Sequence, residues 1–160
     1  MKRCRGMTQV ADDLRQRTFR YGLRIISLCH KLPDTWQCRE IGRQLLRAGM
    51  GVPGNYWSAC RGRSPAEFIA KLGVAADEAE ECVLWLTAII QSGINHGLET
   101  KGLLGEGEEL RAILSKSHKT ARENRQRKVR EAKSSRSQLA KSPSRQITNS
   151  PITKSNEALP

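Results

Sequence analysis

The chain is poor in aromatic and apolar side chains. Phe, Trp and Tyr make up 4% of its 160 residues, and the hydrophobic residues together make up 38%. A chain of this length holds one domain and a tail, since a typical domain takes about 100 to 200 residues. So small an apolar fraction indicates that part of the chain does not join a packed core.

Long hydrophobic runs are also missing. The longest, CVLWLTAII at residues 82–90, is about half as long as the roughly 20 residues that a membrane-spanning helix needs. The start, MKRCRGMTQVADD, lacks the apolar core of a secretory signal peptide, and either Met1 or Met7 can be the first residue. We therefore expect a cytoplasmic protein.

No cysteine pair has the CxxC spacing of a metal or redox site. The odd number of cysteines and their placement in predicted helices favour reduced thiols that pack as small apolar side chains. The five are Cys4, Cys29, Cys38, Cys60 and Cys82.

Motifs of catalysis and cofactor binding are absent as well. The sequence holds no P-loop, no GxSxG, no HExxH and no dinucleotide fingerprint. His30, His96 and His118 are far apart in sequence, with His96 expected in a turn and His118 in solvent. The acidic run DEAEE at 77–81 has no Glu-x-x-His partner, so we expect an acidic outer face rather than a metal site. We predict no catalytic residue, no metal and no cofactor.

What the chain has in excess is positive charge. Its formal net charge is +12 and its pI is near 10.0. Residues 116–160 carry twelve Lys and Arg against three acidic residues, whereas residues 1–115 carry sixteen against thirteen. A nearly balanced body with a basic tail predicts an anionic partner: nucleic acid, a membrane surface or an acidic protein.

The apolar pattern has the period of α-helices, and no stretch alternates as a strand does. From Asp12 to Leu32, apolar or nearly apolar residues recur at steps of three and four, and Pro33 ends this helix. Asp34 or Thr35 can cap a second helix, whose apolar positions begin with Trp36. We predict an all-α, antiparallel up-down four-helix bundle over residues 12–130. Residues 1–11 should be flexible, and residues 131–160 should form a disordered basic tail.

The second helix contains several residues that disfavour helices: Gly49, Gly51, Pro53 and Gly54. Either it ends near Gly49 and restarts at Pro53, or it continues with a kink. The apolar phase carries on through Val52 and Tyr56, which favours the kink.

The third helix has clear boundaries. Ser64, Pro65 and Glu67 form a capping box, and Gly93 and Gly97 are candidate stops. The fourth should begin near Leu103, with the sequence GLLGEG at 102–107 marking its start and Leu104, Leu110, Ile113 and Leu114 on its inner face.

Arginines recur along the predicted helices. In residues 1–115, twelve of the sixteen cations are Arg, which binds phosphate in a bidentate manner and stacks on bases. One stripe follows the first helix, a second follows the second helix, a pair precedes the third, and a basic arm ends the fourth. The candidate nucleic-acid-binding residues are Arg17, Arg20, Arg24, Arg39, Arg43, Arg47, Arg61, Arg63, Arg122, Arg125, Arg127, Lys128 and Arg130. The alternatives are a solvated face with local pairs such as Asp13–Arg17, and a tail that only aids solubility.

Several stretches together resemble one protein family. They are FRYGLRIISLCHKLP at 19–33, QLLRAGMGVPGNY at 44–56, RSPAEFIAKL at 63–72 and LRAILSKSHKTAR at 110–122. The set resembles the small four-helix-bundle proteins encoded in intervening sequences of bacterial large-subunit ribosomal RNA. The accessory variability determinants of diversity-generating retroelements share that fold. The similarity covers roughly residues 14–122.

The resemblance implies a continuous second helix, no enzymatic activity and a ring-like homopentamer with a basic outer surface. It also implies binding to RNA, or to a reverse transcriptase and its RNA. The sequence departs from the family at Ser58, where Glu is usual, and in its longer basic tail. We therefore expect an oligomeric bundle that binds structured RNA, with an adapter for a reverse transcriptase as the alternative. A catalytic or metal-binding bundle is a third, less favoured, reading.

Overall fold

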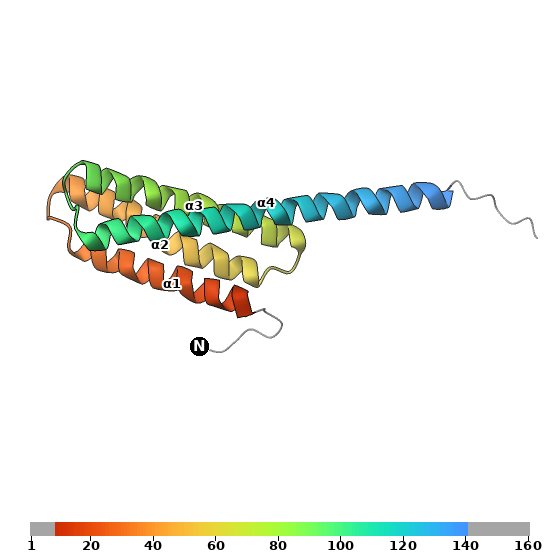
Figure 1. The fold of residues 1–160 in the computed structure, drawn as a ribbon, viewed down its shortest axis with the longest axis horizontal. Helices are drawn as coiled ribbons and strands as arrows, with labels where there is room; N and C mark the ends of the chain where they lie inside the picture. Colours follow the sequence, from red (N-terminus) through yellow and green to blue (C-terminus); the bar gives the residue numbers. More distant parts are fainter. Residues whose placement is uncertain (1–8, 141–160) are drawn as a thin grey trace, which may run out of the picture. The chain divides into compact units, whose positions relative to one another are not determined.

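The computed structural model describes residues 9–140, which form four helices and no strand. They are α1 (Gln9–His30), α2 (Trp36–Cys60), α3 (Pro65–Gln91) and α4 (Leu98–Ala140). Figure 1 shows α1, α2, α3 and the part of α4 up to Gln126 lying side by side. The predicted all-α four-helix bundle is thus confirmed. The chain divides into two units, Met1–Gln126 and Arg127–Pro160, and each is described by itself.

Contacts between helices show that α1 and α2 are antiparallel. Near the end of α1, the Cys29 thiol donates to the Gly42 carbonyl at 3.5 Å, early in α2. Near its start, the Arg15 carbonyl accepts from the indole of Trp57 at 3.2 Å, late in α2. The two helices therefore run in opposite directions.

The same order holds around the rest of the bundle. Along α3 and α4, Gly73 faces His118 while Glu80 pairs with Arg111 at 3.1 Å. Along α1 and α4, Arg17 pairs with Glu106 while Lys31 pairs with Glu99. Each neighbouring pair is antiparallel, which is the up-down topology.

The core follows the predicted helical stripes. On α1, Tyr21, Ile25 and Leu28 are almost fully buried, and α3 buries residues at helical spacing from Leu72 to Ile89. Trp36 departs from the prediction because its side chain is 70% exposed. It occupies the first position of α2, two residues before Cys38, the first buried residue of the helix.

The run of glycines and Pro53 lies inside α2, which is continuous from Trp36 to Cys60. Packing explains the glycine at position 49. A Cβ there would lie 2.6 Å from Cδ1 of Ile25, so only glycine lets α1 approach α2 this closely. Asn55 donates its amide to the Gly51 carbonyl at 2.9 Å. Pro53 has no amide hydrogen, so it leaves the carbonyl of Gly49, four residues earlier, without its helical donor. The Asn55 hydrogen bond is made to a different carbonyl.

The predicted helix ends are largely confirmed. The Ser64 hydroxyl accepts from the Glu67 amide at 3.1 Å, and the Glu67 carboxylate accepts from the Arg63 amide at 2.9 Å. Thr35 caps α2 by accepting from Cys38. Gly93 follows α3 with a φ of 76°, a conformation that favours glycine.

The predicted bounds of α4 differ from the structure at both ends. The helix begins at Leu98 rather than near Leu103, so GLLGEG is interior, and Leu103 joins the core. Asn95 organises the earlier start, because its side chain accepts from the Gly97 amide and the Thr100 hydroxyl. Residues 131–140 are helical, although their composition predicted disorder. An Arg127–Glu131 pair one turn apart and the low cost of extending an existing helix account for this. The predicted flexible start, residues 1–11, is helical at 9–11, because α1 begins at Gln9 and the Gln9 side-chain amide donates to Asp13 one turn later. Residues 1–8 and 141–160, the rest of the predicted start and tail, lie outside the described residues.

Candidate nucleic-acid interface

The arginines of α1 divide into one that joins helices and two that do not. Arg17 reaches α4, where its guanidinium contacts Glu106 at 2.7 Å and Glu109 at 2.5 Å. Hydrogen bonds to these two carboxylates raise the pKa of Arg17. Its partners are on α4 rather than at Asp13, which accepts from Gln9. Arg20 and Arg24 are exposed and have no ion pair within the described residues.

A cluster of unpaired cations gathers at one end of the first unit. Gly73 of α3 faces His118 of α4, so the two residues lie at the same level. Eight residues separate Gly73 from the start of α3, and seven separate His118 from Arg125. Each distance is about 11 to 12 Å along the helix axis. Arg125 therefore lies level with the connection between α2 and α3, and Arg122 lies about one turn before it.

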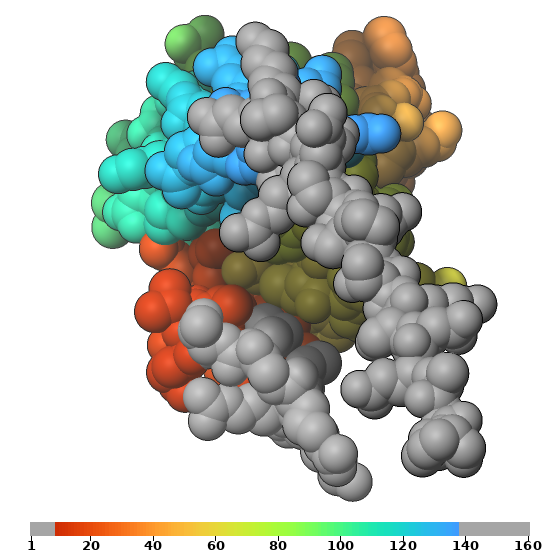
Figure 2. Space-filling model, turned by 90° about the vertical axis from the view of Figure 1, so that its right-hand side faces the viewer, coloured from red at the N-terminus to blue at the C-terminus, as the bar shows by residue number. Residues whose placement is uncertain are grey.

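That connection carries Arg61 and Arg63, which are exposed and have no ion pair with a described residue. Arg125 also follows the buried Leu114 and the half-buried Ala121 at helical spacing, so the inner face of α4 turns cationic where the core ends. Figure 2 looks onto this end and shows the first turns of α1, in red, beside the connection, in yellow-green. We call the exposed cations within about two helical turns of this end the end surface: Arg61, Arg63, Lys119, Arg122 and Arg125.

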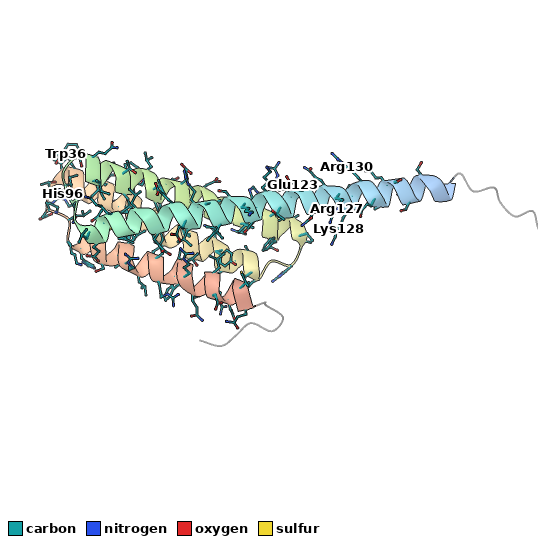
Figure 3. The ribbon with its side chains drawn as sticks, viewed as in Figure 1. Trp36, His96, Glu123, Arg127, Lys128 and Arg130 are labelled. Carbon is teal, nitrogen blue, oxygen red and sulfur yellow. The ribbon has the colours of Figure 1, made fainter. Side chains whose placement is uncertain are left out.

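The second unit is basic in its described part. Arg127, Lys128 and Arg130 are exposed, and they point away from the helix in different directions (Figure 3). Arg127 also lies 3.8 Å from Glu131. The segment thus offers cations around its circumference rather than along one stripe.

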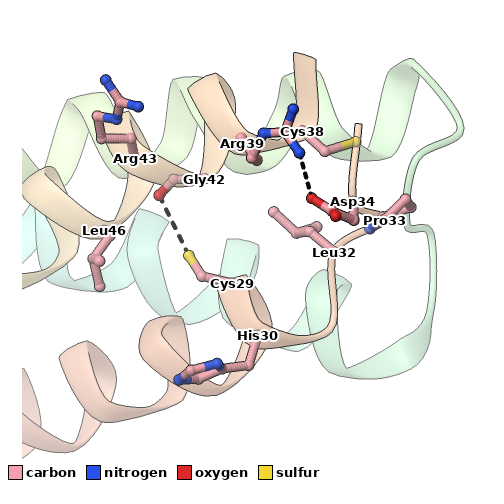
Figure 4. Close-up of a pocket in the computed structure, with 10 residues that line it drawn as sticks. All are labelled: Cys29, His30, Leu32, Pro33, Asp34, Cys38, Arg39, Gly42, Arg43 and Leu46. Atoms are coloured by element: carbon pink, nitrogen blue, oxygen red, sulfur yellow. Dashed lines mark hydrogen bonds and ion pairs between the residues drawn. The ribbon is translucent and has the colours of Figure 1, made fainter. Parts of the chain in front are cut away.

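The arginines of α2 are more exposed than Arg17, but each has an acidic neighbour. Arg39 contacts Asp34 at 2.6 Å (Figure 4), Arg43 lies 3.6 Å from Glu40, and Arg47 lies 3.7 Å from Glu81. Exposed pairs of this kind are worth about 0–1 kcal/mol. They leave the side chains able to move, yet they reduce the local positive charge.

Sequence reasoning missed Arg15, which packs at the end of the bundle. Arg15 is 7% exposed and contacts Asp12 at 3.1 Å, and its guanidinium carbon lies 5.4 Å from the Trp57 ring centroid. Phe19 lies against the same ring, with centroids 5.5 Å apart. The only signal for Arg15 is its place three residues before Thr18 on the buried stripe.

The acidic run on α3 is not a uniform outer face. Glu80 pairs with Arg111 and Glu81 lies near Arg47, as an outer face would allow. Glu78 instead packs over Gly51, where a Cβ would lie 2.5 Å from its carboxyl carbon. Burial, and then the nearby Glu81, raises the pKa of Glu78. His118 also differs from the prediction, because it packs on Gly73 and is half-buried.

Burial favours the protonated forms of two cysteines and both tyrosines. Burial raises the pKa of Cys82 to about 12 and raises the pKa values of Tyr21, Tyr56 and Cys29. All four cysteines in the described part of the chain are free thiols, and Cys4 lies outside it. A thiol kept protonated by burial is a poor nucleophile.

Neither a metal site nor a membrane-spanning helix occurs in residues 9–140. No cluster of three or more His, Cys, Asp or Glu side chains in this range could hold a metal ion. None of the helices in the same range has an apolar stretch long enough to cross a bilayer.

Comparison with known proteins gives a family and a fold. The family model described as "23S rRNA-intervening sequence protein" matches residues 12–116. A crystal structure of a protein of unknown function from Bacteroides thetaiotaomicron, assigned to the S23 ribosomal protein family, has the same fold. Its TM-score is 0.63 at 24% identity, over 68% of this chain and 97% of that one. No curated protein matches the chain. Neither match bears on diversity-generating retroelements, so that link stays a prediction. The match over residues 12–116 places this chain in the 23S rRNA-intervening sequence protein family.

Proposed function

We propose that this protein is a non-catalytic bundle that binds structured RNA through its arginines. The observation that carries the proposal is the end surface, where five exposed cations from α4 and the α2–α3 connection occur at one end of the first unit and form no ion pair with a described residue. Unpaired guanidinium groups can contact phosphates without first breaking an ion pair. The family's own description, which names ribosomal RNA, supports the same direction.

The other predicted arginines have graded roles in this proposal. Arg20 and Arg24 extend the cationic surface along α1, and Arg127, Lys128 and Arg130 add a basic arm. The α2 stripe contributes less per residue, because each of its arginines has a carboxylate within 4 Å. Arg17 is mainly structural because it joins α1 to α4.

The test measures RNA affinity against salt concentration for the full chain and two triple variants. One replaces Arg61, Arg63 and Arg122 by Gln, and the matched control replaces Arg39, Arg43 and Arg47 by Gln. Each removes three charges. Each lost phosphate contact should reduce the slope of log affinity against log salt by about 0.7 to 0.9. We therefore expect a loss of about 2 to 3 in slope for the first variant and clearly less for the second.

Equal losses in the two variants would mean that net charge, rather than the end surface, sets the affinity. Unchanged affinity in both would show that neither set binds RNA. Circular dichroism checks that helix content is the same in all three chains. A third variant, with Gln at Arg127, Lys128 and Arg130, measures the share of the arm in the same assay.

We also propose that the protein is a homo-oligomer, which the resemblance predicts to be a pentamer. The observation in its favour is an exposed apolar strip on α1 and α2, made by Leu23, Leu46 and Met50. Met50 reaches α1 at Gly22, so the strip spans both helices. A single large exposed side chain is common, but a contiguous strip indicates a covered face. Sedimentation should show that Met50→Lys dissociates the assembly without loss of helix content, and a wild-type monomer would end this proposal.

A further inference from the structure

A hollow at the end of α2 lies within the end surface. It is lined by Gly54, Trp57, Ser58, Arg61, Arg63 and Glu67. The small residues of α2 keep it open: a Cβ on Gly54 would meet nothing within 4 Å. The Ser58 hydroxyl turns back along the helix to the Gly54 carbonyl at 2.8 Å. The hollow is therefore free space beside an aromatic ring.

Trp57 is held in place by three contacts on the side of α1. Its indole nitrogen donates to the Arg15 carbonyl at 3.2 Å, and the Arg15 guanidinium lies over its ring. Phe19 packs on it at a tilt of 40°. A ring fixed in this way loses little freedom when a ligand contacts its remaining surface, and such preorganisation favours binding.

The rim of the hollow is cationic. Arg61 and Arg63 are exposed and have no ion pair with any described residue. The one acidic group, Glu67, accepts from the backbone amide of Arg63 at 2.9 Å and so completes the cap of α3. Two positive charges against one negative charge leave a net attraction for a single phosphate.

We propose that this hollow takes one unpaired nucleotide of a bound RNA. The base lies against Trp57, and its phosphate is held by Arg61 and Arg63. Proteins that read single-stranded RNA stack its bases on aromatic rings and guanidinium planes. A base paired in a duplex is not available for such stacking. The inference rests on the proposed RNA binding and specifies that unpaired segments are preferred.

A second pocket in the bundle lacks the features that suit the hollow to a nucleotide. It lies between the end of α1 and the start of α2, and its lining includes Leu32, Leu46 and Arg39 (Figure 4). No Phe, Tyr or Trp lines it, and its Arg39 is held by Asp34 at 2.6 Å. Its one aromatic ring is the smaller imidazole of His30, and both of its arginines have a carboxylate neighbour, Asp34 for Arg39 and Glu40 for Arg43.

The test compares the affinity of the full chain for a stem–loop RNA and for a blunt duplex with the same number of phosphates. Stacking of one base is worth about a 5- to 150-fold preference for the stem–loop. Gly54→Leu should fill the hollow and remove the preference while duplex affinity stays unchanged. Gly105→Leu is the matched control, because Gly105 is also helical, exposed and free of neighbours within 4 Å. It should keep the preference.

A spectroscopic readout leaves Trp57 in place. A Trp36→Phe, Trp85→Phe chain has Trp57 as its only tryptophan, and its emission should be quenched by the stem–loop and not by the duplex. Equal affinity for the two RNAs, a preference that survives Gly54→Leu, or unchanged emission at saturation would overturn the inference while RNA binding itself stands. Failure of either RNA to bind in a salt-dependent manner would overturn the proposed function together with the inference.

Discussion

Gly49 gives the most direct test of how α1 and α2 pack. A Cβ at this position would lie 2.6 Å from Cδ1, 2.8 Å from Cγ2 and 3.1 Å from Cβ of Ile25, which is fully buried. Carbon atoms in contact prefer about 3.5 to 4.0 Å. Gly49→Ala therefore requires the two helices to separate by several tenths of an ångström or more, or Ile25 to leave its rotamer.

Two opposing effects set the magnitude. Replacing Gly by Ala in a helix interior gains about 1 kcal/mol of helix propensity. Overpacking a filled core costs about 1 to 3 kcal/mol. We expect a net loss of about 1 kcal/mol in the free energy of unfolding, or about 4 °C in melting temperature. Gly54→Ala is the control in the same helix, since its Cβ would meet nothing, and it should gain about 1 kcal/mol.

Urea unfolding at one fixed protein concentration measures both variants, because self-association would otherwise change the apparent stability. Ile25→Val removes the nearest atom, Cδ1, and alone costs about 0.5 to 1.5 kcal/mol. Combined with Gly49→Ala it should cost less than the sum, although Cγ2 keeps the rescue partial. If Gly49→Ala stabilised the protein as much as Gly54→Ala does, the close approach of α1 and α2 would be refuted.

Three further predictions test other contacts. Arg17→Met should lower the free energy of unfolding by about 1 kcal/mol because it removes the bridge to α4, whereas Arg20→Met should change it by less than about 0.5 kcal/mol and weaken RNA binding instead. Because burial raises the pKa of Glu78 above its ordinary value of 4.5, the stability that this group contributes is present below that value and is lost as pH rises through the folded pKa. Glu78→Gln should therefore gain stability relative to the wild type as pH rises from about 4 to about 7, measured by thermal melts. Pro53→Ala should leave helix content unchanged, because α2 is already continuous, and a loss of far-ultraviolet circular dichroism would contradict this.

The sequence was sufficient for the helices and most of the core. Strong periodicity in α1 and α3 and the capping box at Ser64 are local signals, and local signals survive folding well. The start of α4 was predicted too late because Gly102 and Gly105 disfavour a helix in the sequence. Each glycine costs a helix only about 1 kcal/mol, and tertiary packing overrides that cost. The helix at 131–140 was missed for a related reason, since extension of an existing helix costs far less than nucleation.

The candidate interface was harder to predict because charge pairing is not local. Spacing alone placed Arg17, Arg20 and Arg24 on one stripe, and nothing in that spacing separates them. Only the fold brings Glu106 and Glu109, some ninety residues later, to Arg17. The grouping of Arg61 with Arg122 depends in the same way on the antiparallel pairing of α3 and α4.

The division between paired and unpaired cations explains how a small bundle can be both stable and basic. The cations that lie over carboxylates, such as Arg17 and Arg111, hold helices together and lose part of their attraction for phosphate. The cations without such partners gather where the core ends, at Arg61, Arg63 and Arg125. Positive charge concentrated there repels itself least when a polyanion neutralises it. RNA binding should therefore stabilise the folded chain, and the stabilisation should decline with salt as the affinity does.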